Sequence, residues 1–370
     1  MGSAEASIRA AIQQDGAISF ARFMELALYS PGSGYYETHA RTIGRRGDYF
    51  TSVSVGPVFG DCLALGIALE WARTGARPDG WSLLEAGAHD GRLALDILNS
   101  LKRRFPELYA SVRYQIIEPS EIRRAWQRDA LSEHSDRLSH VPRVEDLDDF
   151  KGVFLCNELF DAFPVHRFSW SVERQSWREL GVGESDGALV WRELNSPSID
   201  FRDAVRAADL LLPDELCAAL PDGYVLELCP SAAEWWGRLA ARLREGYLAT
   251  IDYGCGAGEW IQPERVSGTA RAYSGHASSS DILAKPGERD LTSHVNFGAL
   301  ELAGRKAGLL TRHWARQGVF LSTIAREAVE RGWELGWNSA ELRQFQTLVH
   351  PQHLGHSFRV LVQQTRPAGQ

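Results

Sequence analysis

A glycine-spaced turn between a short apolar strand and an amphipathic helix is the feature that most constrains this fold. The strand is predicted at 81–85, the turn at 87–91 and the helix at 92–104. A second apolar strand, 112–117, follows and is succeeded at once by Glu118. In a parallel sheet both strands end at the carboxyl edge, where open α/β folds bind nucleotides. The pattern therefore predicts an adenosine-binding edge.

The residues at this edge suit a cofactor that has a ribose but no pyrophosphate. The backbone at Gly87 and Gly91 can approach a ligand because no side chain intervenes. Glu85 ends the first strand, and Glu118 can accept two hydrogen bonds from ribose hydroxyls. Neither the dinucleotide nor the phosphate-loop glycine pattern is present, and His89 stands where a middle glycine is expected. These residues favour S-adenosylmethionine, although they also fit an ordinary strand-to-helix turn.

The order of elements predicts an α/β fold with a mostly parallel sheet. From residue 81 onward, strands alternate with helices, which is typical of a parallel sheet covered on both faces. We expect four segments along the chain. They are an N-terminal helical segment (1–75), the first part of the core (76–164), an inserted α+β subdomain (165–223) and the rest of the core (224–370), which carries a long substrate-side loop at 254–280.

Composition excludes several classes of protein. The net charge of −8 over 370 residues gives no sign of a nucleic-acid surface. The five cysteines lack metal-ligand spacing and predict reduced thiols in a cytosolic protein. No apolar run is long enough for a membrane span, and the N-terminus lacks a secretion pattern. We expect a cytoplasmic protein with no nucleic-acid or membrane partner.

A second group of polar residues follows the most apolar strand, 153–156. Asn157 and Glu158 can meet a substrate nitrogen and its proton, and Asp161 can cap the next turn. Methyl transfer needs little acid–base chemistry, because alignment and desolvation contribute most of the rate. In the alternative interpretation, Asn157 and Asp161 only satisfy turn amides.

Two histidines lie further along, His276 and His294. Their spacing is not that of a metal site, so no metal is expected. We expect Asp290 and Thr292 to cap a helix and His294 to pack in the core. A substrate-binding role for either histidine stays open, because loops after strands often carry function.

The sequence resembles the MidA-like family of bacterial and mitochondrial S-adenosylmethionine-dependent methyltransferases, which includes a complex I assembly factor. Seven blocks in order carry the resemblance, nearly end to end. The blocks are Phe23–Tyr29 with Gly34–Tyr36, Gly47–Ser52 with Phe59-Gly60, Asn157–Pro164, Ile251–Gly254, Arg271–Tyr273 with His276, Pro286-Gly287 with Asp290, Thr292, His294 and Val295, and Gln317–Leu321.

The resemblance implies a Rossmann-like methyltransferase sheet, with a second subdomain built from the N-terminal segment and the insertion. It implies that Thr51, Ser52 and Asn157 lie near the methyl donor, beside the cofactor-binding Glu85, Gly87, Gly91 and Glu118. The family is associated with dimethylation of a protein arginine, so Glu158 would hold the guanidinium and Asp161 would support the site. Tyr36, Tyr253, His276 and His294 are the expected substrate-binding residues.

Three departures from the family pattern leave the acceptor open. Val53-Ser54 replaces a Pro-Glu pair, Gly56 replaces a serine, and His89 replaces a glycine. Three functions follow as alternatives: a protein arginine N-methyltransferase, a small-molecule O- or N-methyltransferase with an aromatic pocket, and a non-catalytic assembly factor that keeps the cofactor site. A homodimer is possible, and a mitochondrial matrix location is expected only in a eukaryote, since no transit peptide is visible.

Overall fold

A computed structural model describes residues 3–38, 51–75, 80–274 and 277–366. The chain divides into two compact units, and each is described by itself. The core unit contains 43–159, 237–254 and 304–370, and the second unit contains 1–42, 160–236 and 255–303. Within the described residues, no helix is both long and apolar enough to cross a membrane.

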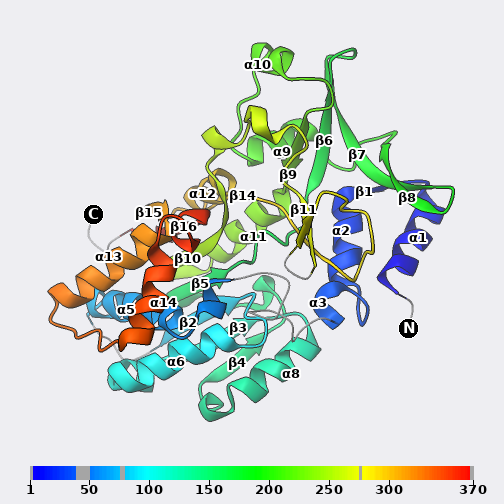
Figure 1. Cartoon of the computed structure of the whole chain (residues 1–370). Helices are drawn as coiled ribbons and strands as arrows, with labels where there is room; N and C mark the ends of the chain where they lie inside the picture. Colours follow the sequence, from blue (N-terminus) through cyan, green and yellow to red (C-terminus); the bar gives the residue numbers. More distant parts are fainter. Residues whose placement is uncertain (1–2, 39–50, 76–79, 275–276, 367–370) are drawn as a thin grey trace. The chain divides into compact units, whose positions relative to one another are not determined.

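The core unit is built on one mostly parallel sheet (Figure 1). Its strands are β2 (Trp81–Ala86), β3 (Arg113–Ile117), β4 (Leu138–Val141), β5 (Phe150–Asn157), β10 (Leu243–Cys255), β15 (Leu310–Arg316) and β16 (Phe358–Gln364). They lie in the order β15–β16–β10–β5–β2–β3–β4. The strands from β4 to β10 in this order are parallel, whereas β16 is antiparallel to both of its neighbours. The predicted α/β fold is confirmed.

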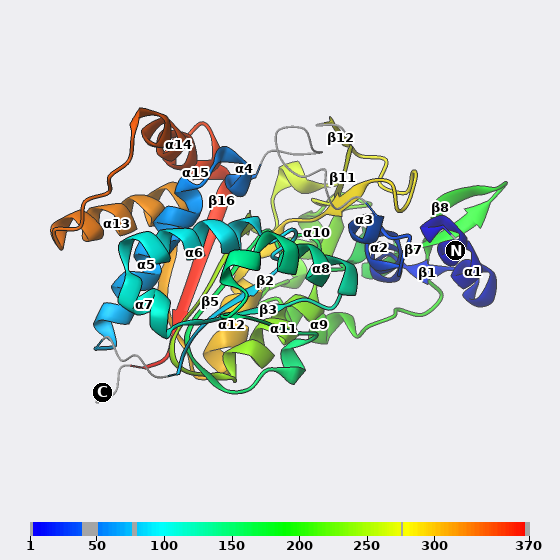
Figure 2. The same ribbon diagram turned by 90° about the horizontal axis from the view of Figure 1, so that it is seen from below.

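Helices cover this sheet because their apolar residues recur on one face. The helices are α4 (Ser52–Val55), α5 (Val58–Arg73), α6 (Arg92–Arg104), α7 (Pro106–Ser111), α8 (Glu121–Ala130), α13 (Gln317–Glu330), α14 (Ser339–Val349) and α15 (Leu354–Ser357). In α6, Leu93, Ile97 and Leu101 recur every four residues and are all buried. Figure 2 shows the ribbons of helices α5, α6 and α13 in the core unit. The buried residues of these helices share one core with strand side chains of a single sheet face.

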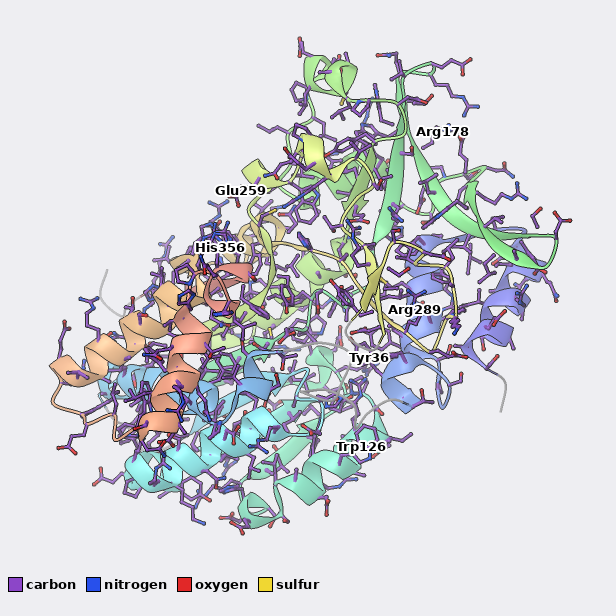
Figure 3. All side chains as sticks on the ribbon, in the orientation of Figure 1. Tyr36, Trp126, Arg178, Glu259, Arg289 and His356 are labelled. Carbon is purple, nitrogen blue, oxygen red and sulfur yellow. The ribbon has the colours of Figure 1, made fainter. Side chains whose placement is uncertain are left out.

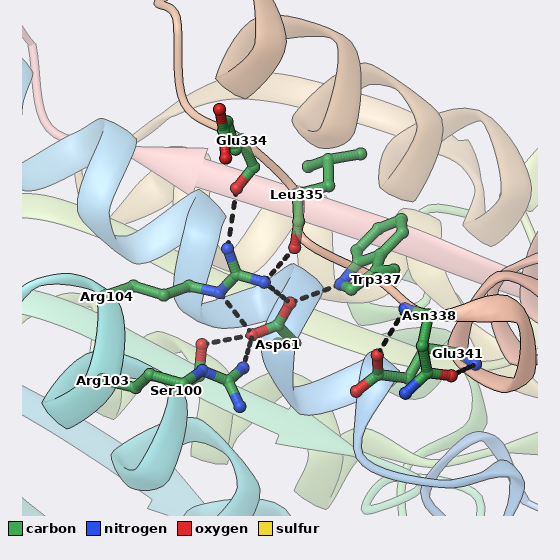
Figure 4. A network of polar contacts seen from close by, with 9 residues as sticks. All are labelled: Asp61, Ser100, Arg103, Arg104, Glu334, Leu335, Trp337, Asn338 and Glu341. Atoms are coloured by element: carbon green, nitrogen blue, oxygen red, sulfur yellow. Dashed lines mark hydrogen bonds and ion pairs between the residues drawn. The ribbon is translucent and has the colours of Figure 1, made fainter.

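A buried carboxylate, Asp61 in α5, ties this helical layer together (Figure 4). Asp61 is 4% exposed and accepts hydrogen bonds from the side chains of Ser100, Arg103, Arg104 and Trp337. The donor–acceptor distances run from 2.5 Å for Ser100 Oγ to 3.0 Å for Arg103 Nη2. Arg104 also donates to the backbone carbonyls of Glu334 and Leu335. One side chain thus joins α5, α6 and the segment between α13 and α14.

The second unit combines a five-stranded sheet with a three-stranded one. Its sheet strands are β1 (Ile18–Ser19), β6 (His166–Ser171), β7 (Ser176–Ser185), β8 (Ala188–Glu193), β9 (Val225–Leu228), β11 (Arg271–Ser274), β12 (Ala277–Ser279) and β13 (Asp290–Thr292). The short strand β14 (Val295–Asn296) follows in the chain and belongs to neither of these two sheets. Its helices are α1 (Ala4–Asp15), α2 (Phe20–Tyr29), α3 (Tyr35–Thr38), α9 (Phe201–Ala207) and α10 (Asp214–Ala219). Along the chain, α11 (Pro230–Ala240) and α12 (Phe297–Lys306) each contain a unit boundary.

Two predictions about the region after β10 are wrong. The stretch 254–280 was expected to be a loop, but it contains two 3₁₀ turns and the paired strands β11 and β12. Asp290 and Thr292 do not cap a helix, because both lie in β13, which pairs with β11. Asn296 caps instead, since its Oδ1 accepts a hydrogen bond from the backbone N–H of Ala299 in α12. Strands as short as these, with serine and alanine among their few residues, look like loop in sequence, which explains the first error.

Candidate active site

The glycine turn after β2 adopts a left-handed backbone at three positions. Gly87, His89 and Gly91 have φ angles of 73°, 47° and 86°. A Cβ at Gly87 would lie 3.2 Å from Leu159 Cδ1, and Gly91 caps the start of α6. His89 holds the strained conformation with a side chain, which is uncommon and is typical of functional turns.

Strand register brings the predicted residues to one edge of the core unit. Ala86 pairs with Ile117 of β3 on one side and with Cys156 of β5 on the other. The next residues along these strands, Glu118, Gly87 and Asn157, therefore end three adjacent parallel strands. The edge predicted from the sequence is present, with the glycine turn in its middle.

Glu118 is fully buried at this edge and already oriented. Its Oε1 accepts a hydrogen bond from the backbone N–H of Ser120 at 2.9 Å, and its Oε2 accepts one from Gln127 Nε2 at 3.3 Å. Arg123 Nε lies 3.5 Å from Oε1. A carboxylate fixed in this way is oriented to accept hydrogen bonds from hydroxyl donors.

Glu85 lies in β2, two residues before Gly87, and contacts the neighbouring strand β3. Its Oε2 accepts a hydrogen bond of 2.6 Å from the hydroxyl of Tyr114 in β3. Burial raises the pKa of Glu85 from 4.5 to about 7, the bond from Tyr114 opposes this, and the charge of Asp90 adds to it. A direct role for Glu85 in cofactor binding stays a prediction.

Glu85→Gln should make the ligand-free protein more stable at neutral and alkaline pH. The raised pKa means that the folded state holds a proton between pH 4.5 and about 7 that the unfolded state releases. Stability therefore falls as pH rises through this window, by up to about 3 kcal/mol. Glutamine keeps the bond from Tyr114 without this cost. Urea unfolding should give equal stabilities below pH 4.5 and a gain at pH 8; equal stabilities at pH 8 would contradict the assignment.

Asn157 and Glu158 form a coupled pair at the end of β5. Asn157 Nδ2 donates a hydrogen bond of 2.8 Å to Glu158 Oε1. Glu158 has a φ of 51°, so the chain turns sharply at this residue. Asn157 Oδ1 is buried and accepts no hydrogen bond within the described part of the chain. A buried acceptor at this edge fits a donor group brought by a ligand.

Asp252 in β10, which the sequence did not single out, holds this turn. Its Oδ2 accepts a hydrogen bond from the backbone N–H of Leu159, and its Oδ1 accepts one from that of Tyr253. The carbonyl of Ile251 accepts one from the N–H of Glu158. The Ile251–Gly254 block was the available signal. Tyr253 itself packs on Phe358, with ring centroids 4.0 Å apart.

Thr51 and Ser52 belong to a short helix whose cap explains one departure from the family pattern. The hydroxyl of Thr51 accepts a hydrogen bond from the N–H of Ser54, and the hydroxyl of Ser54 accepts one from the N–H of Thr51. Serine thus completes a capping box at the position usual for glutamate. Ser52 is buried and donates to Gln317 Oε1 at 2.9 Å. Gly56 follows with a φ of 141°, which strains any residue other than glycine.

The remaining predicted residues lie in the second unit. Tyr36 is on α3 (Figure 3), and its hydroxyl donates to Asp290 Oδ1 at 2.9 Å. Asp161 is buried, and its carbonyl accepts a hydrogen bond from the N–H of Ser293. His294 is exposed rather than packed in the core, so that expectation is wrong. His276 lies outside the described residues.

No group of three or more potential metal ligands occurs among the residues that the structure describes. All five cysteines are free thiols, and four of them are buried. The polar groups of the edge are instead carboxylates, amides and backbone atoms. This donor set fits an organic cofactor with hydroxyl and amine groups.

The chain is similar to known methyltransferases. A family model described as an S-adenosyl-L-methionine-dependent methyltransferase matches residues 62–315. The mitochondrial protein arginine methyltransferase NDUFAF7 homolog of Drosophila melanogaster is 28% identical, over 97% of this chain and 84% of that protein. Human mitochondrial protein arginine methyltransferase NDUFAF7 is 26% identical, over 94% of this chain and 80% of its own length.

Similar solved structures provide evidence about the cofactor. A Burkholderia thailandensis protein with bound S-adenosyl-homocysteine is 29% identical, with a TM-score of 0.83 over 98% of this chain and 91% of that one. A native crystal structure of an uncharacterised protein from the same organism is 28% identical, with a TM-score of 0.79 and the same coverage. The cofactor is S-adenosyl-L-methionine, and the protein is a methyltransferase. The chain belongs to the MidA-like family of S-adenosyl-L-methionine-dependent methyltransferases.

Proposed function

We propose that this enzyme transfers a methyl group to a guanidinium nitrogen of a protein arginine. The observation that carries the proposal is the Asn157–Glu158 pair, a carboxylate and an amide fixed at the sheet edge that also holds the glycine turn. A guanidinium is a planar cation that pairs well with such a carboxylate. The names of the relatives, which are protein arginine methyltransferases, support the same acceptor.

Within this proposal, the chain's residues bind and align. Gly87 and Gly91 let the backbone contact the cofactor, and Glu118 binds the ribose. Glu158 holds the guanidinium and Asn157 orients Glu158. The cofactor, when bound, supplies an electrophilic methyl group, so the protein needs mainly to align the nitrogen and exclude water.

The residues of the capping helix and of the second unit complete the proposal. Thr51 holds α4 in place beside the donor, and Ser52 anchors the same helix through Gln317. Asp161, Tyr36 and His294 of the second unit stay proposed substrate-side residues, as does Tyr253 at the end of β10 in the core unit.

A small-molecule acceptor is the alternative, and two observations weaken it. Ser54 has a capping role, so its presence in place of an acid is no sign of a changed acceptor. Tryptophans that could line the aromatic pocket of such an enzyme pack on other rings instead. These contacts are Trp170 on Trp177, Trp177 on Phe201, and Trp235 and Trp236 on Phe160.

A labelling experiment tests the acceptor. Enzyme and donor carrying a tritiated methyl group are incubated with a protein extract from cells that lack the enzyme, and the proteins are hydrolysed. We expect the label in methylated arginine. Label confined to small molecules, with none in protein, would contradict the proposal and favour the alternative.

Glu118→Ala tests the cofactor assignment. Removing hydrogen bonds to a charged group should weaken S-adenosyl-homocysteine binding by about 1.5–3 kcal/mol, or roughly 10- to 150-fold. Calorimetric titration measures the change, with Glu121→Ala on the exposed face of α8 as the control. Unchanged affinity would mean that Glu118 does not bind the ribose.

The location of the enzyme is a separate question. The relatives' names place those proteins in mitochondria, whereas the sequence predicts the cytoplasm. We retain the cytoplasmic location and the possible homodimer as proposals, to be tested by fractionation of the source cells and by sedimentation of the purified protein.

A further inference from the structure

Gln127 is the one described residue of α8 whose side chain is fully buried. The rest of the helix is exposed or half-buried, so an apolar side chain would be the ordinary choice at this position. Burying an amide without partners is costly. The partners of Gln127 therefore indicate why an amide is present.

The amide of Gln127 connects the glycine turn at 87–91 to the carboxylate of Glu118. Its Nε2 donates to the carbonyl oxygen of His89, in the glycine turn, at 3.0 Å. The same nitrogen donates to Glu118 Oε2 at 3.3 Å. The α8 backbone is also close to the turn, since a Cβ at Gly91 would lie 3.4 Å from Gln127 Cα.

His140 in β4 fixes which way the amide points. His140 Nε2 lies 3.0 Å from Gln127 Oε1, and an amide oxygen can only accept, so the imidazole donates. With the oxygen held in this way, both N–H groups of the amide face the turn and Glu118. Burial lowers the pKa of His140, with the charges of Arg128 and Arg124 adding to it, so the donor is a neutral imidazole. Arg123 also lies close to Glu118, with its Nε 3.5 Å from Oε1.

We propose that Gln127 is a positioning residue for cofactor binding, and that its amide sets the spacing between the glycine turn and the carboxylate of Glu118. The inference rests on the proposed ribose contact of Glu118. Gln127 touches neither cofactor nor substrate in this role. It acts through the His89 carbonyl and through Glu118, and His140 acts through Gln127.

Gln127→Glu gives a pH signature that a space-filling role would not produce. The two side chains have nearly the same shape, but the introduced carboxylate faces Glu118 and the His89 carbonyl. We expect S-adenosyl-homocysteine affinity, measured by calorimetry, to fall at least about tenfold relative to wild type at pH 8. Like-charge repulsion raises the pKa of the introduced group, so at pH 5.5 the loss should shrink to about threefold or less. A ratio to wild type within twofold at both pH values would overturn the proposal.

A second variant covers the case in which Gln127→Glu does not fold. Gln127→Met keeps the length of the side chain and removes its donors, so affinity should fall by about three- to tenfold at both pH values. Gln352→Glu, an exposed change of the same charge after α14, is the matched control and should bind as wild type does. Melting of each variant without ligand confirms that it is folded. A folded Gln127→Met protein with wild-type affinity would also overturn the proposal.

The Glu118→Ala result separates this inference from the one on which it rests. If Glu118→Ala binds normally, the ribose contact itself is wrong. If Glu118→Ala weakens binding and neither Gln127 variant does, the ribose contact stands and only the positioning role of Gln127 is wrong.

Discussion

Asp61→Ala should lower the free energy of unfolding by about 3–5 kcal/mol, the range expected when one partner of a buried charge network is removed. Asp61 is 4% exposed and accepts hydrogen bonds from four side chains. Without it, the half-buried Arg104 guanidinium and the half-buried indole N–H of Trp337 keep fewer acceptors. The segment before α14 would lose its main polar attachment to α5 (Figure 4).

Urea unfolding at pH 7 measures the effect, and Asp149→Ala is the matched control. Asp149 is an exposed carboxylate of the same unit that pairs with Arg244 at 2.5 Å. An exposed pair of this kind contributes about 0–1 kcal/mol. Equal losses in the two variants would show that burial of Asp61 has no special importance.

Glu158→Gln should reduce arginine methylation by about 10²–10³-fold, the scale found when a charge-stabilising group is removed from an active site. Glutamine keeps the size of the side chain and an oxygen that can accept the bond from Asn157. It has no negative charge to hold a guanidinium. Cofactor affinity should stay within about twofold, because no residue proposed to bind the ribose is changed.

Turnover with the labelled donor and calorimetry with S-adenosyl-homocysteine give the two readouts. Glu121→Gln, on an exposed position of α8, serves as the control for the loss of one acid. Undiminished turnover would remove Glu158 from the acceptor site. Loss of both turnover and cofactor affinity would instead mean that Glu158 supports the whole edge.

The cofactor edge was predictable because local signals and sheet register agree there. Trp81–Ala86 is apolar and β-prone, Gly87 and Gly91 fit left-handed positions, and α6 has a clear period. A residue that directly follows a parallel strand lies at the carboxyl edge whatever the rest of the chain does. This geometry placed Glu118 and Asn157 correctly at one edge without any knowledge of tertiary contacts.

The supporting contacts were not predictable, because they join residues far apart in sequence. Gln127 looks like any polar residue of an amphipathic helix, and only the packing of α8 reveals that it is buried. Tyr114 and Asp252 likewise take their roles from neighbouring strands. The short strands after β10 were not predicted for a related reason: their stability comes from pairing rather than from β-propensity.

The residues proposed for the donor and those proposed for the acceptor are distributed differently over the two compact units, with Glu158 and Tyr253 of the acceptor group in the core unit. Every residue proposed to hold the donor comes from one of them, whereas Tyr36, Asp161 and His294 belong to the other. If these assignments hold, substitutions at Tyr36, Asp161 and His294 should change the use of the acceptor and leave the dissociation constant of the donor unchanged. A hybrid that carries the second unit of a relative should keep the guanidinium contact of Glu158 and bind S-adenosyl-L-methionine with native affinity, and should differ only in the parts of the acceptor that the second unit contacts.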